Sequence, residues 1–238
     1  ILNLLSLNPA PNACQRNVGG NSCRPKTYQE NTMSKEYLPF EDITETHPWV
    51  RFPQYDNASL NLIIGSFPPN KFTSHKEKLT MSDMNFFYGS KENSFWELFT
   101  KAKKLNFKLP DELDDLKNWL KENNWMVTDI VKSTKRKKDT AYDTDMLQIE
   151  WNLEAINNII DKNPIEKIFF TSQWVKNNFD KKIRPKLNSK EIINEIILLS
   201  PSRNGLRTAK KAKFTNQAPL PVETSEEFRK RYYETVFN

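Results

Sequence analysis

Four short runs of β-branched and aliphatic residues, separated by segments with helical spacing, constrain the fold more than any other feature of the sequence. The runs are 60–64 (LNLII), 125–131 (WMVTDIV), 167–171 (KIFFT) and 195–199 (EIILL). The segments between and after them place apolar residues every three or four positions, as amphipathic helices do. These segments are 93–105, 112–122, 149–160, 173–179 and 225–236. Strands that alternate with helices form a parallel sheet covered on both faces. We therefore predict an α/β fold, a single three-layer α/β/α domain with a central, mainly parallel four-stranded sheet.

Glycine is scarce, with 5 in 238 residues, and only Gly65, Gly89 and Gly205 lie beyond residue 32. Isolated glycines cannot build a G-x-G-x-x-G or Walker A loop, so glycine-rich phosphate loops are excluded. No apolar run approaches the roughly 18 residues that a membrane-spanning helix needs, and we expect no membrane partner. The hydrophobic fraction of 37% is too high for a wholly disordered chain.

Residues 1–32 are rich in Asn, Pro, Gly and Ser and show no sustained period. We interpret them as a disordered extension and residues 33–238 as the folded domain. The extension is either a read-through or expression remnant ahead of a natural start at Met33, which we favour, or a functional tail. Both cysteines, Cys14 and Cys23, lie in it. The remaining chain therefore cannot form a cysteine-ligated zinc site or an iron–sulfur cluster, and its lack of cysteine fits a reducing cytoplasm.

Positive charge is concentrated in two windows within a chain of net charge +6. The first window holds Lys132, Lys135, Arg136, Lys137 and Lys138, and the second holds Arg203, Arg207, Lys210, Lys211 and Lys213. Neither window contains an acidic residue, and the rest of 33–238 is net acidic. Such a distribution suits a polyanion held at one face, because Lys and Arg gain affinity for phosphates through counterion release. The alternative is two solvated surface loops.

Three segments at predicted strand exits and a helix entrance carry a family resemblance. They are Gly65-Ser66-Phe67-Pro68-Pro69, the segment 86–96 (FFYGSKENSFW), and Leu198-Leu199-Ser200-Pro201-Ser202. In this order they resemble the uracil-DNA glycosylase superfamily, particularly its mismatch-specific and hypoxanthine-DNA glycosylase branches. Those families have a G-x-x-P-G loop, an aromatic segment closing on an N-x-F-W helix start, and an L-P-S-P-S-like loop. The resemblance covers about residues 60–207.

The resemblance implies a DNA repair enzyme that hydrolyses the N-glycosidic bond of a flipped-out deaminated base of the uracil or hypoxanthine class. It implies base-binding roles for Gly65, Ser66, Phe67, Pro68, Tyr88 and Gly89, with Tyr88 stacking on the base. It implies catalytic roles for Ser90 and Asn93, which would place water, and for Asp129, which would read the base edge. It implies DNA contacts from Ser200, Pro201, Ser202, Arg203 and Arg207. We expect DNA as partner, a monomer, and no cofactor or metal.

Some residues depart from the family pattern. Phe67 stands where relatives often carry the Asp or Asn that positions water, and a phenyl ring cannot activate water. Ser90 stands where relatives carry His or Asn, and Pro69 and Leu199 also replace the usual residues. The last loop has no histidine. Of the two histidines in the chain, His47 and His75, only His75 lies in a loop from which we expect it to reach the site, and exposure to solvent is the preferred account of it.

For two of the site residues, a structural role and a functional role carry equal weight. Asn93 can cap the helix that it precedes, with or without a part in the site. Asp129 can cap a nearby loop, or it can accept a hydrogen bond from uracil or hypoxanthine.

Two other functions remain open. A DNA-binding module that has kept this fold but lost catalysis is favoured by Phe67 and Ser90. A small-molecule hydrolase on a similar sheet is disfavoured by the placement of the basic windows.

Overall fold

The computed structural model describes residues 44–238 except 57, 74–78, 139 and 189–193. All described residues belong to one compact unit that spans Phe40–Asn238. The extension predicted over 1–32, with both cysteines, lies outside the described residues, and so does His75. No helix in the described part of the chain is long and apolar enough to cross a membrane.

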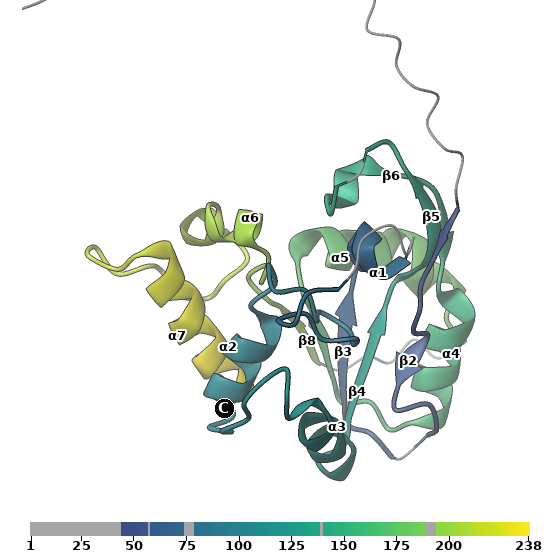
Figure 1. Cartoon of the computed structure of the whole chain (residues 1–238), viewed down its shortest axis with the longest axis horizontal. Coiled ribbons are helices and arrows are strands. Elements are labelled where there is room, and N and C mark those ends of the chain that lie inside the picture. The colour runs from purple at the N-terminus through teal and green to yellow at the C-terminus, as the bar shows by residue number, and fades with distance from the viewer. Residues whose placement is uncertain (1–43, 57, 74–78, 139, 189–193) are drawn as a thin grey trace, which may run out of the picture. The chain divides into compact units, whose positions relative to one another are not determined.

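The main sheet has five strands in the order β2-β4-β3-β7-β8 (Figure 1). They are β2 (Arg51–Phe52), β3 (Asn61–Gly65), β4 (Trp125–Asp129), β7 (Lys167–Phe170) and β8 (Asn194–Ile197). Strands β4, β3, β7 and β8 correspond to the four predicted runs, and neighbouring pairs among them are parallel. The predicted count of four is wrong, because the short β2 adds an antiparallel fifth strand beside β4.

A second, antiparallel sheet was not predicted. It contains β1 (Glu45–Thr46), β5 (Val131–Arg136) and β6 (Met146–Trp151) in the order β1-β5-β6. The run predicted as one strand over 125–131 divides at Ile130, where the chain passes from β4 into β5. There the N–H groups of Ile130 and Val131 donate to the carbonyl oxygens of Gly65 and Ser66, at 2.9 and 3.2 Å. The second sheet thus begins directly beside the loop that follows β3.

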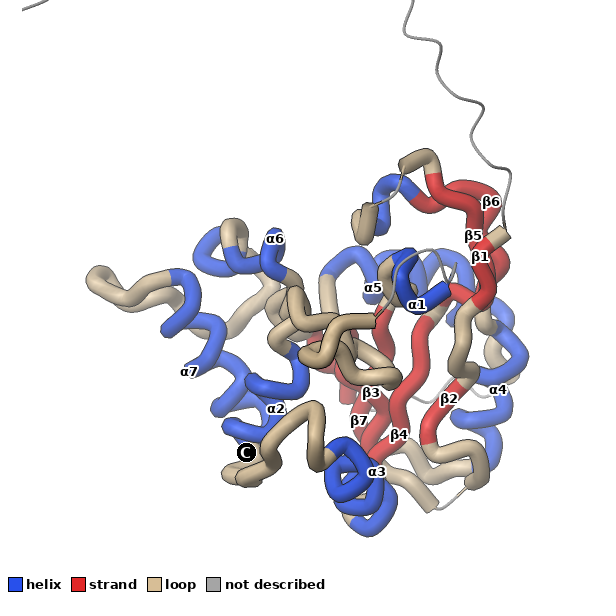
Figure 2. The backbone as a smooth tube through the Cα atoms, in the orientation of Figure 1, coloured by secondary structure: helices blue, strands red, loops and turns tan. Residues whose placement is uncertain are grey.

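Seven α-helices are present in the described residues (Figure 2). They are α1 (Asn70–Thr73), α2 (Phe95–Ala102), α3 (Leu113–Glu122), α4 (Leu153–Lys162), α5 (Gln173–Asn178), α6 (Arg203–Leu206) and α7 (Ser225–Phe237). A π-helical turn, Phe179–Ile183, extends α5, and 3-10 turns lie at Asp143–Asp145, Arg184–Lys186 and Ala209–Lys211. The last helix begins with a reciprocal capping box between Thr224 and Glu227, which satisfies free N–H groups at its start.

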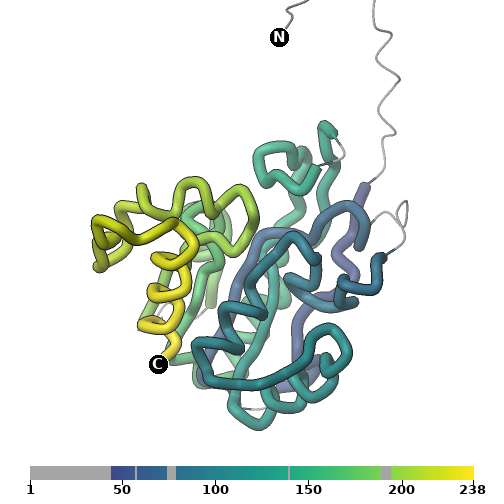
Figure 3. The backbone as a smooth tube through the Cα atoms, turned by 60° about the vertical axis from the view of Figure 1, so that its left-hand side comes forward, coloured from purple at the N-terminus to yellow at the C-terminus, as the bar shows by residue number. Residues whose placement is uncertain are grey.

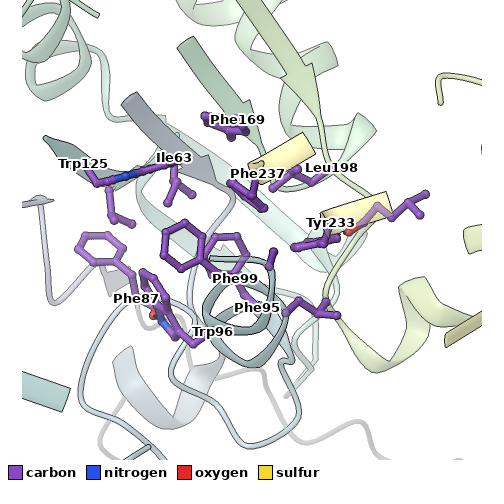
Figure 4. Packing of buried hydrophobic residues seen from close by; sticks show 14 of the residues in the cluster. Ile63, Phe87, Phe95, Trp96, Phe99, Trp125, Phe169, Leu198, Tyr233 and Phe237 are labelled. Atoms are coloured by element: carbon purple, nitrogen blue, oxygen red, sulfur yellow. Dashed lines mark hydrogen bonds between the residues drawn. The ribbon is translucent and has the colours of Figure 1, made fainter. Parts of the chain in front are cut away.

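Alternate side chains of β3 point to opposite faces of the main sheet and enter two separate cores. Ile63 joins a core with residues of α2, α3 and α7, whereas Leu62 and Ile64 join a core with residues of α4 and α5. Figure 4 shows the first core, in which Phe99 of α2 and Phe237 of α7 pack beside one another at 5.0 Å between ring centroids. Helices on both faces of the sheet make the predicted three layers.

The long connections after β3 and β8 meet at one end of the sheet. Ser94 N–H, just before α2, donates to Pro201 O at 3.1 Å, and Asn93 forms an isolated bridge with Ser202. In Figure 3 the yellow-green segment that carries α6 follows β8 on this same side of the molecule. The connections contain α1 and α6, so they are not structureless loops. They enclose the space beyond the carboxyl ends of the parallel strands, where ligands bind in open α/β sheets.

Candidate functional site

A cavity of about 490 Å³ opens beyond the carboxyl ends of β3, β4, β7 and β8. Its walls come from all three segments that carry the family resemblance and from the turn between β5 and β6. The lining residues are Ser66, Phe67, Pro68, Pro69, Lys71, Tyr88, Ser90, Glu92, Asn93, Asp129, Thr140, Ala141, Tyr142, Asp143, Thr171, Ser172, Ser200, Pro201, Ser202, Arg203 and Asn204. A cavity of this size, closed on several sides, is large enough for a small organic ligand.

Asp129, at the end of β4, is buried in the cavity floor and accepts two hydrogen bonds. His47 Nδ1 accepts the N–H of Trp49 at 3.0 Å, so Nε2 carries the proton and donates to Asp129 Oδ2 at 2.8 Å. The hydroxyl of Tyr88 donates to Asp129 Oδ1 at 3.2 Å and lies 3.3 Å from Thr128 O. Both carboxylate oxygens therefore act as acceptors, and Asp129 is fixed from two sides.

Tyr88 is held rigidly in the cavity wall. Its ring lies 4.6 Å from that of Phe95, between centroids, and its backbone has a φ of 56°. Burial and the negative charge of Asp129 raise the pKa of its phenol well above the ordinary value, so the hydroxyl stays a donor. A stacking role for Tyr88 stays a prediction, and the structure adds that its hydroxyl braces Asp129.

Gly65 has a local packing reason to be glycine. A Cβ on Gly65 would lie 2.4 Å from Asp129 Oδ1, 2.5 Å from Tyr88 Cε1 and 2.6 Å from the Tyr88 hydroxyl. We had expected the glycine to admit a base or sugar. The structure shows that its missing side chain already admits the Asp129–Tyr88 contact.

Ser90 and Asn93 both line the cavity, and their roles in placing water stay predictions. Ser90 is buried, and its Oγ accepts the N–H of Glu92 at 3.3 Å. Asn93 Oδ1 accepts the N–H of Phe95 at 2.9 Å, which satisfies a free donor in the first turn of α2 although Ser94 is the cap residue by backbone position. The structural role of Asn93 is thus present, and no hydrogen bond among the described residues engages its Nδ2.

The Ser200-Pro201-Ser202 loop is fixed from below by α7. Arg229 is 4% exposed and donates from Nη1 to Ser200 O at 3.1 Å and to Ser202 O at 3.2 Å, and from Nη2 to Ser94 Oγ at 3.3 Å. One buried guanidinium therefore ties this loop to the start of α2. Arg229 could not be predicted from the sequence, because it lies in a charged stretch of the last predicted helix and has no motif around it.

The first basic window is not a solvated loop. It lies mainly in β5, where Arg136 is buried and paired with Glu45, Nε to Oε2, at 3.1 Å. Arg136 also donates to Pro68 O at 2.5 Å and Thr140 O at 2.8 Å, and its guanidinium lies 5.3 Å from the Phe67 ring centroid. Arg136 thus joins β5 to the loop after β3, and the window presents less free positive charge than its sequence suggests.

Phe67 is buried, with 8% of its surface exposed, and packs between Arg136 and His47. The ring centroids of His47 and Phe67 lie 5.5 Å apart. Its side chain therefore packs the loop against β5 and His47. Only the backbone of Phe67 can offer polar groups to the cavity.

Asp143 is a further cavity residue, and it was not predicted from the sequence. It begins the 3-10 turn Asp143–Asp145 between β5 and β6, is half-buried, and lines the cavity together with Ser66. Burial raises the pKa of its carboxyl to about 6, Ser66 and Arg136 lower it, and the charge of Asp129 adds to the rise. No sequence motif surrounds Asp143, and only the fold of the second sheet brings it here.

The second basic window lies on the surface beside the cavity. Arg203 begins α6, lines the cavity, and has a side chain that is 82% exposed, 3.4 Å from Glu92 Oε2. Arg207, Lys210, Lys211 and Lys213 are exposed along the following segment. Within residues 44–238, gaps aside, no group of three or more His, Cys, Asp or Glu side chains could hold a metal ion.

The fold and the cavity define an α/β protein with a cavity at the carboxyl edge of its parallel strands. The sequence matches no protein-family model, and a search of curated proteins found no match. Among solved structures, the chain is similar to the solution NMR structure of a "putative Uracil DNA glycosylase" from Methanosarcina acetivorans. The TM-score is 0.50 and the identity 18%, over 82% of this chain and 97% of the other. At this identity the similarity shows a shared fold.

Proposed function

We propose that this protein is a monofunctional DNA glycosylase of the uracil-DNA glycosylase superfamily, in or near its mismatch-specific and hypoxanthine branches. It would act on a deaminated base of the uracil or hypoxanthine class that is flipped out of DNA. The observation that carries the proposal is the 490 Å³ cavity in which the three resembling segments meet. The shared fold with the Methanosarcina acetivorans protein supports it independently of the motifs.

The cavity provides the groups that base excision needs. A flipped base must be held by contacts to its face and edge inside a closed pocket. Tyr88 offers a ring in the wall, and Asp129 offers acceptor lone pairs beyond those used by His47 and Tyr88. An ionised carboxylate can accept the N3–H of uracil or the N1–H of hypoxanthine.

The surface around the cavity suits a DNA strand. The loop Ser200–Ser202 offers hydroxyl groups at the rim, and the exposed second basic window follows it directly. Phosphate contacts from such groups position DNA without reading its sequence.

The lack of cysteine beyond residue 32 leads us to expect a cytoplasmic location.

The test is base release from oligonucleotides that contain one uracil, hypoxanthine or xanthine, followed by alkaline cleavage at abasic sites. We expect cleavage of at least one substrate by enzyme in excess. Asp129→Ala should abolish it because the base edge loses its acceptor, whereas Asp56→Ala, in the exposed pair with Arg51, is the matched control and should leave it intact. No abasic product from any substrate would reject the enzymatic proposal.

The alternative function is a DNA-binding protein of the same fold without catalysis. The apolar Phe67, buried where relatives often place a water-positioning residue, favours it. In that case DNA affinity would persist and fall steeply with salt, while no oligonucleotide would lose its base.

A further inference from the structure

Base hydrolysis needs a polar group that holds a water against the sugar, and the loop after β3 does not supply one at its third position. Phe67 there is packed between His47 and Arg136. Asp129, the carboxylate at the end of β4, accepts from His47 and Tyr88, and the proposed function assigns its remaining lone pairs to the base edge. Ser90 and Asn93 also line the cavity and can orient a water, but neither side chain is a base that takes up its proton.

We propose that the carboxylate of Asp143, supplied by the turn between β5 and β6, holds and deprotonates the hydrolytic water. This inference rests on the proposed glycosylase function and adds a catalytic residue that lies outside every segment resembling the family. Its basis is position: Asp143 lines the same cavity as Asp129 and Tyr88, together with Ser66, the residue directly before Phe67.

The turn that carries Asp143 is fixed in place. Arg136 donates to Thr140 O and to Pro68 O, so one guanidinium joins this turn to the loop after β3. Inside the turn, Thr140 Oγ1 donates to Asp145 Oδ2 at 2.6 Å, and Lys137 N–H donates to Asp145 O at 2.9 Å. A catalytic group must be held to within a fraction of an ångström, and these bonds provide that restraint.

Asp143 and Asp129 are held differently. Asp129 is braced directly by two donors, His47 and Tyr88, whereas Asp143 is held through its turn. The pKa of Asp143 is raised to about 6, because burial and Asp129 outweigh Ser66 and Arg136. A general base works best when its pKa lies near the working pH, and Asp143 meets that condition while still ionised at pH 7.

The reaction balances without a cofactor. The C1′–N bond breaks and its electron pair leaves with the base, which departs as an anion, so positive charge develops on the sugar. Water forms the new C1′–O bond and gives a proton to the Asp143 carboxylate. That proton passes through solvent to the base anion, which yields the free base and an abasic deoxyribose.

The test compares Asp143→Asn with Asp114→Asn under single-turnover conditions on the oligonucleotide that the wild type cleaves best. Asp114 lies on α3 in a surface pair with Lys117 and does not line the cavity, so its variant is the matched control. We expect Asp143→Asn to slow base release by about 10²- to 10⁴-fold. Binding to the same DNA with a non-hydrolysable 2′-fluorinated nucleotide should change less than about threefold, since general acid–base groups act in the transition state.

The pH profile separates a base from a structural residue. Wild-type base release should fall about tenfold per pH unit below about pH 6, as Asp143 becomes protonated. The other titratable groups that face the cavity or Asp143 are Asp129, Arg136, Tyr88, Tyr142, Lys71, Glu92 and Arg203. All of them remain in Asp143→Asn, so an inflection in the pH profile that they cause would persist in this variant. We expect the inflection near pH 6 to disappear, because Asp143 causes it.

The two proposals fail in different ways. A wild type that releases no base rejects the glycosylase function itself. A wild type that releases base at the same rate and with the same pH profile as Asp143→Asn leaves the function standing and rejects the role of Asp143. A slower Asp143→Asn that keeps the wild-type inflection also rejects it, because a structural role alone would give that result.

Discussion

The Asp143 carboxyl holds its proton more tightly in the folded chain than in the unfolded chain. Its pKa is about 6 when folded against an ordinary value of 3.8. Between these values the folded state binds more protons, so the free energy of unfolding falls as pH rises from about 4 to about 6. Above about pH 6 Asp143 is ionised in the folded chain, and the free energy of unfolding is lowered by the full cost of that ionisation.

Asp143→Asn should therefore be more stable than the wild type at pH 8 and equally stable at pH 4. A shift of about two pH units corresponds to at most about 3 kcal/mol, and solvent at this half-buried group reduces the expected gain to about 1–2 kcal/mol. Urea unfolding at both pH values measures it. The same stability difference at pH 4 and pH 8 would contradict the raised pKa. A variant that gains stability while losing activity would mark Asp143 as a group kept for function.

Gly65→Ala tests the packing at the end of β3. Its Cβ would force apart Asp129 and Tyr88, which lie within 2.6 Å of the Cβ position. Overpacking of this kind costs about 1–3 kcal/mol, and we expect base release to fall by more than about tenfold. Urea unfolding and single-turnover assays measure both effects.

Gly89→Ala is the comparison variant. Its Cβ would lie 2.0 Å from Met84 O, a backbone atom, so we expect mainly a loss in the free energy of unfolding. Unchanged behaviour of both variants would mean that glycine at these sites is incidental.

At the residue scale, sequence motifs predicted the cavity residues that lie within a few positions of a strand exit or helix entrance. Tyr88, Ser90, Asn93 and Asp129 all line the cavity. His47 could not be predicted, because it reaches Asp129 across 82 residues of sequence and no local pattern reports such a contact.

At the scale of elements, strands buried on both faces were predictable and the second sheet was not. Such strands need continuous apolar runs, and β3, β4, β7 and β8 have them. In β5 buried Val131, Ser133 and Thr134 are interrupted by lysines, so the hydrophobic period is absent and its basic residues were read as a surface patch. Arg136 of this sheet contacts the loop after β3, and Asp143 lines the cavity from the turn between β5 and β6. Arg136 was predicted only as part of a basic window, and Asp143 was not predicted.

Arg229→Met tests the attachment of α7 to the Ser200–Ser202 loop. Methionine keeps much of the side-chain volume but loses the donors to Ser200 O, Ser202 O and Ser94 Oγ. We expect a loss of about 1–3 kcal/mol in the free energy of unfolding and faster amide exchange over 200–206. The control is Lys230→Met, which removes only a surface pair with Glu226 and should cost less than about 1 kcal/mol. Equal effects of the two variants would show that α7 does not hold the loop.

At the scale of the whole molecule, charge placement should decide how DNA binds. The second basic window is exposed beside the cavity, whereas the first contains the buried Arg136 and Lys132 paired with Glu150. The second window therefore presents all of its basic side chains to solvent beside the cavity, and we expect it to contact phosphates there.

Replacing Arg203, Arg207 and Lys211 by alanine should weaken binding to DNA of any sequence. Each lost phosphate contact should reduce the slope of log K against log salt by about 0.7–0.9. The control removes the same charge from Lys181, Lys182 and Lys186, exposed residues beyond α5 that do not line the cavity, and should leave the slope nearly unchanged. Binding titrations at several salt concentrations measure both, and equal slopes for the two variants would reject this surface as the DNA interface.

The fixed loop at the cavity rim has a consequence for the order in which the chain is made. Arg229 lies 29 residues after Ser200, whose carbonyl oxygen it holds. During synthesis on the ribosome the sheet and most of the cavity wall emerge before α7 does. The rim can be locked only when α7 has emerged and docked, so we expect the cavity to be completed last.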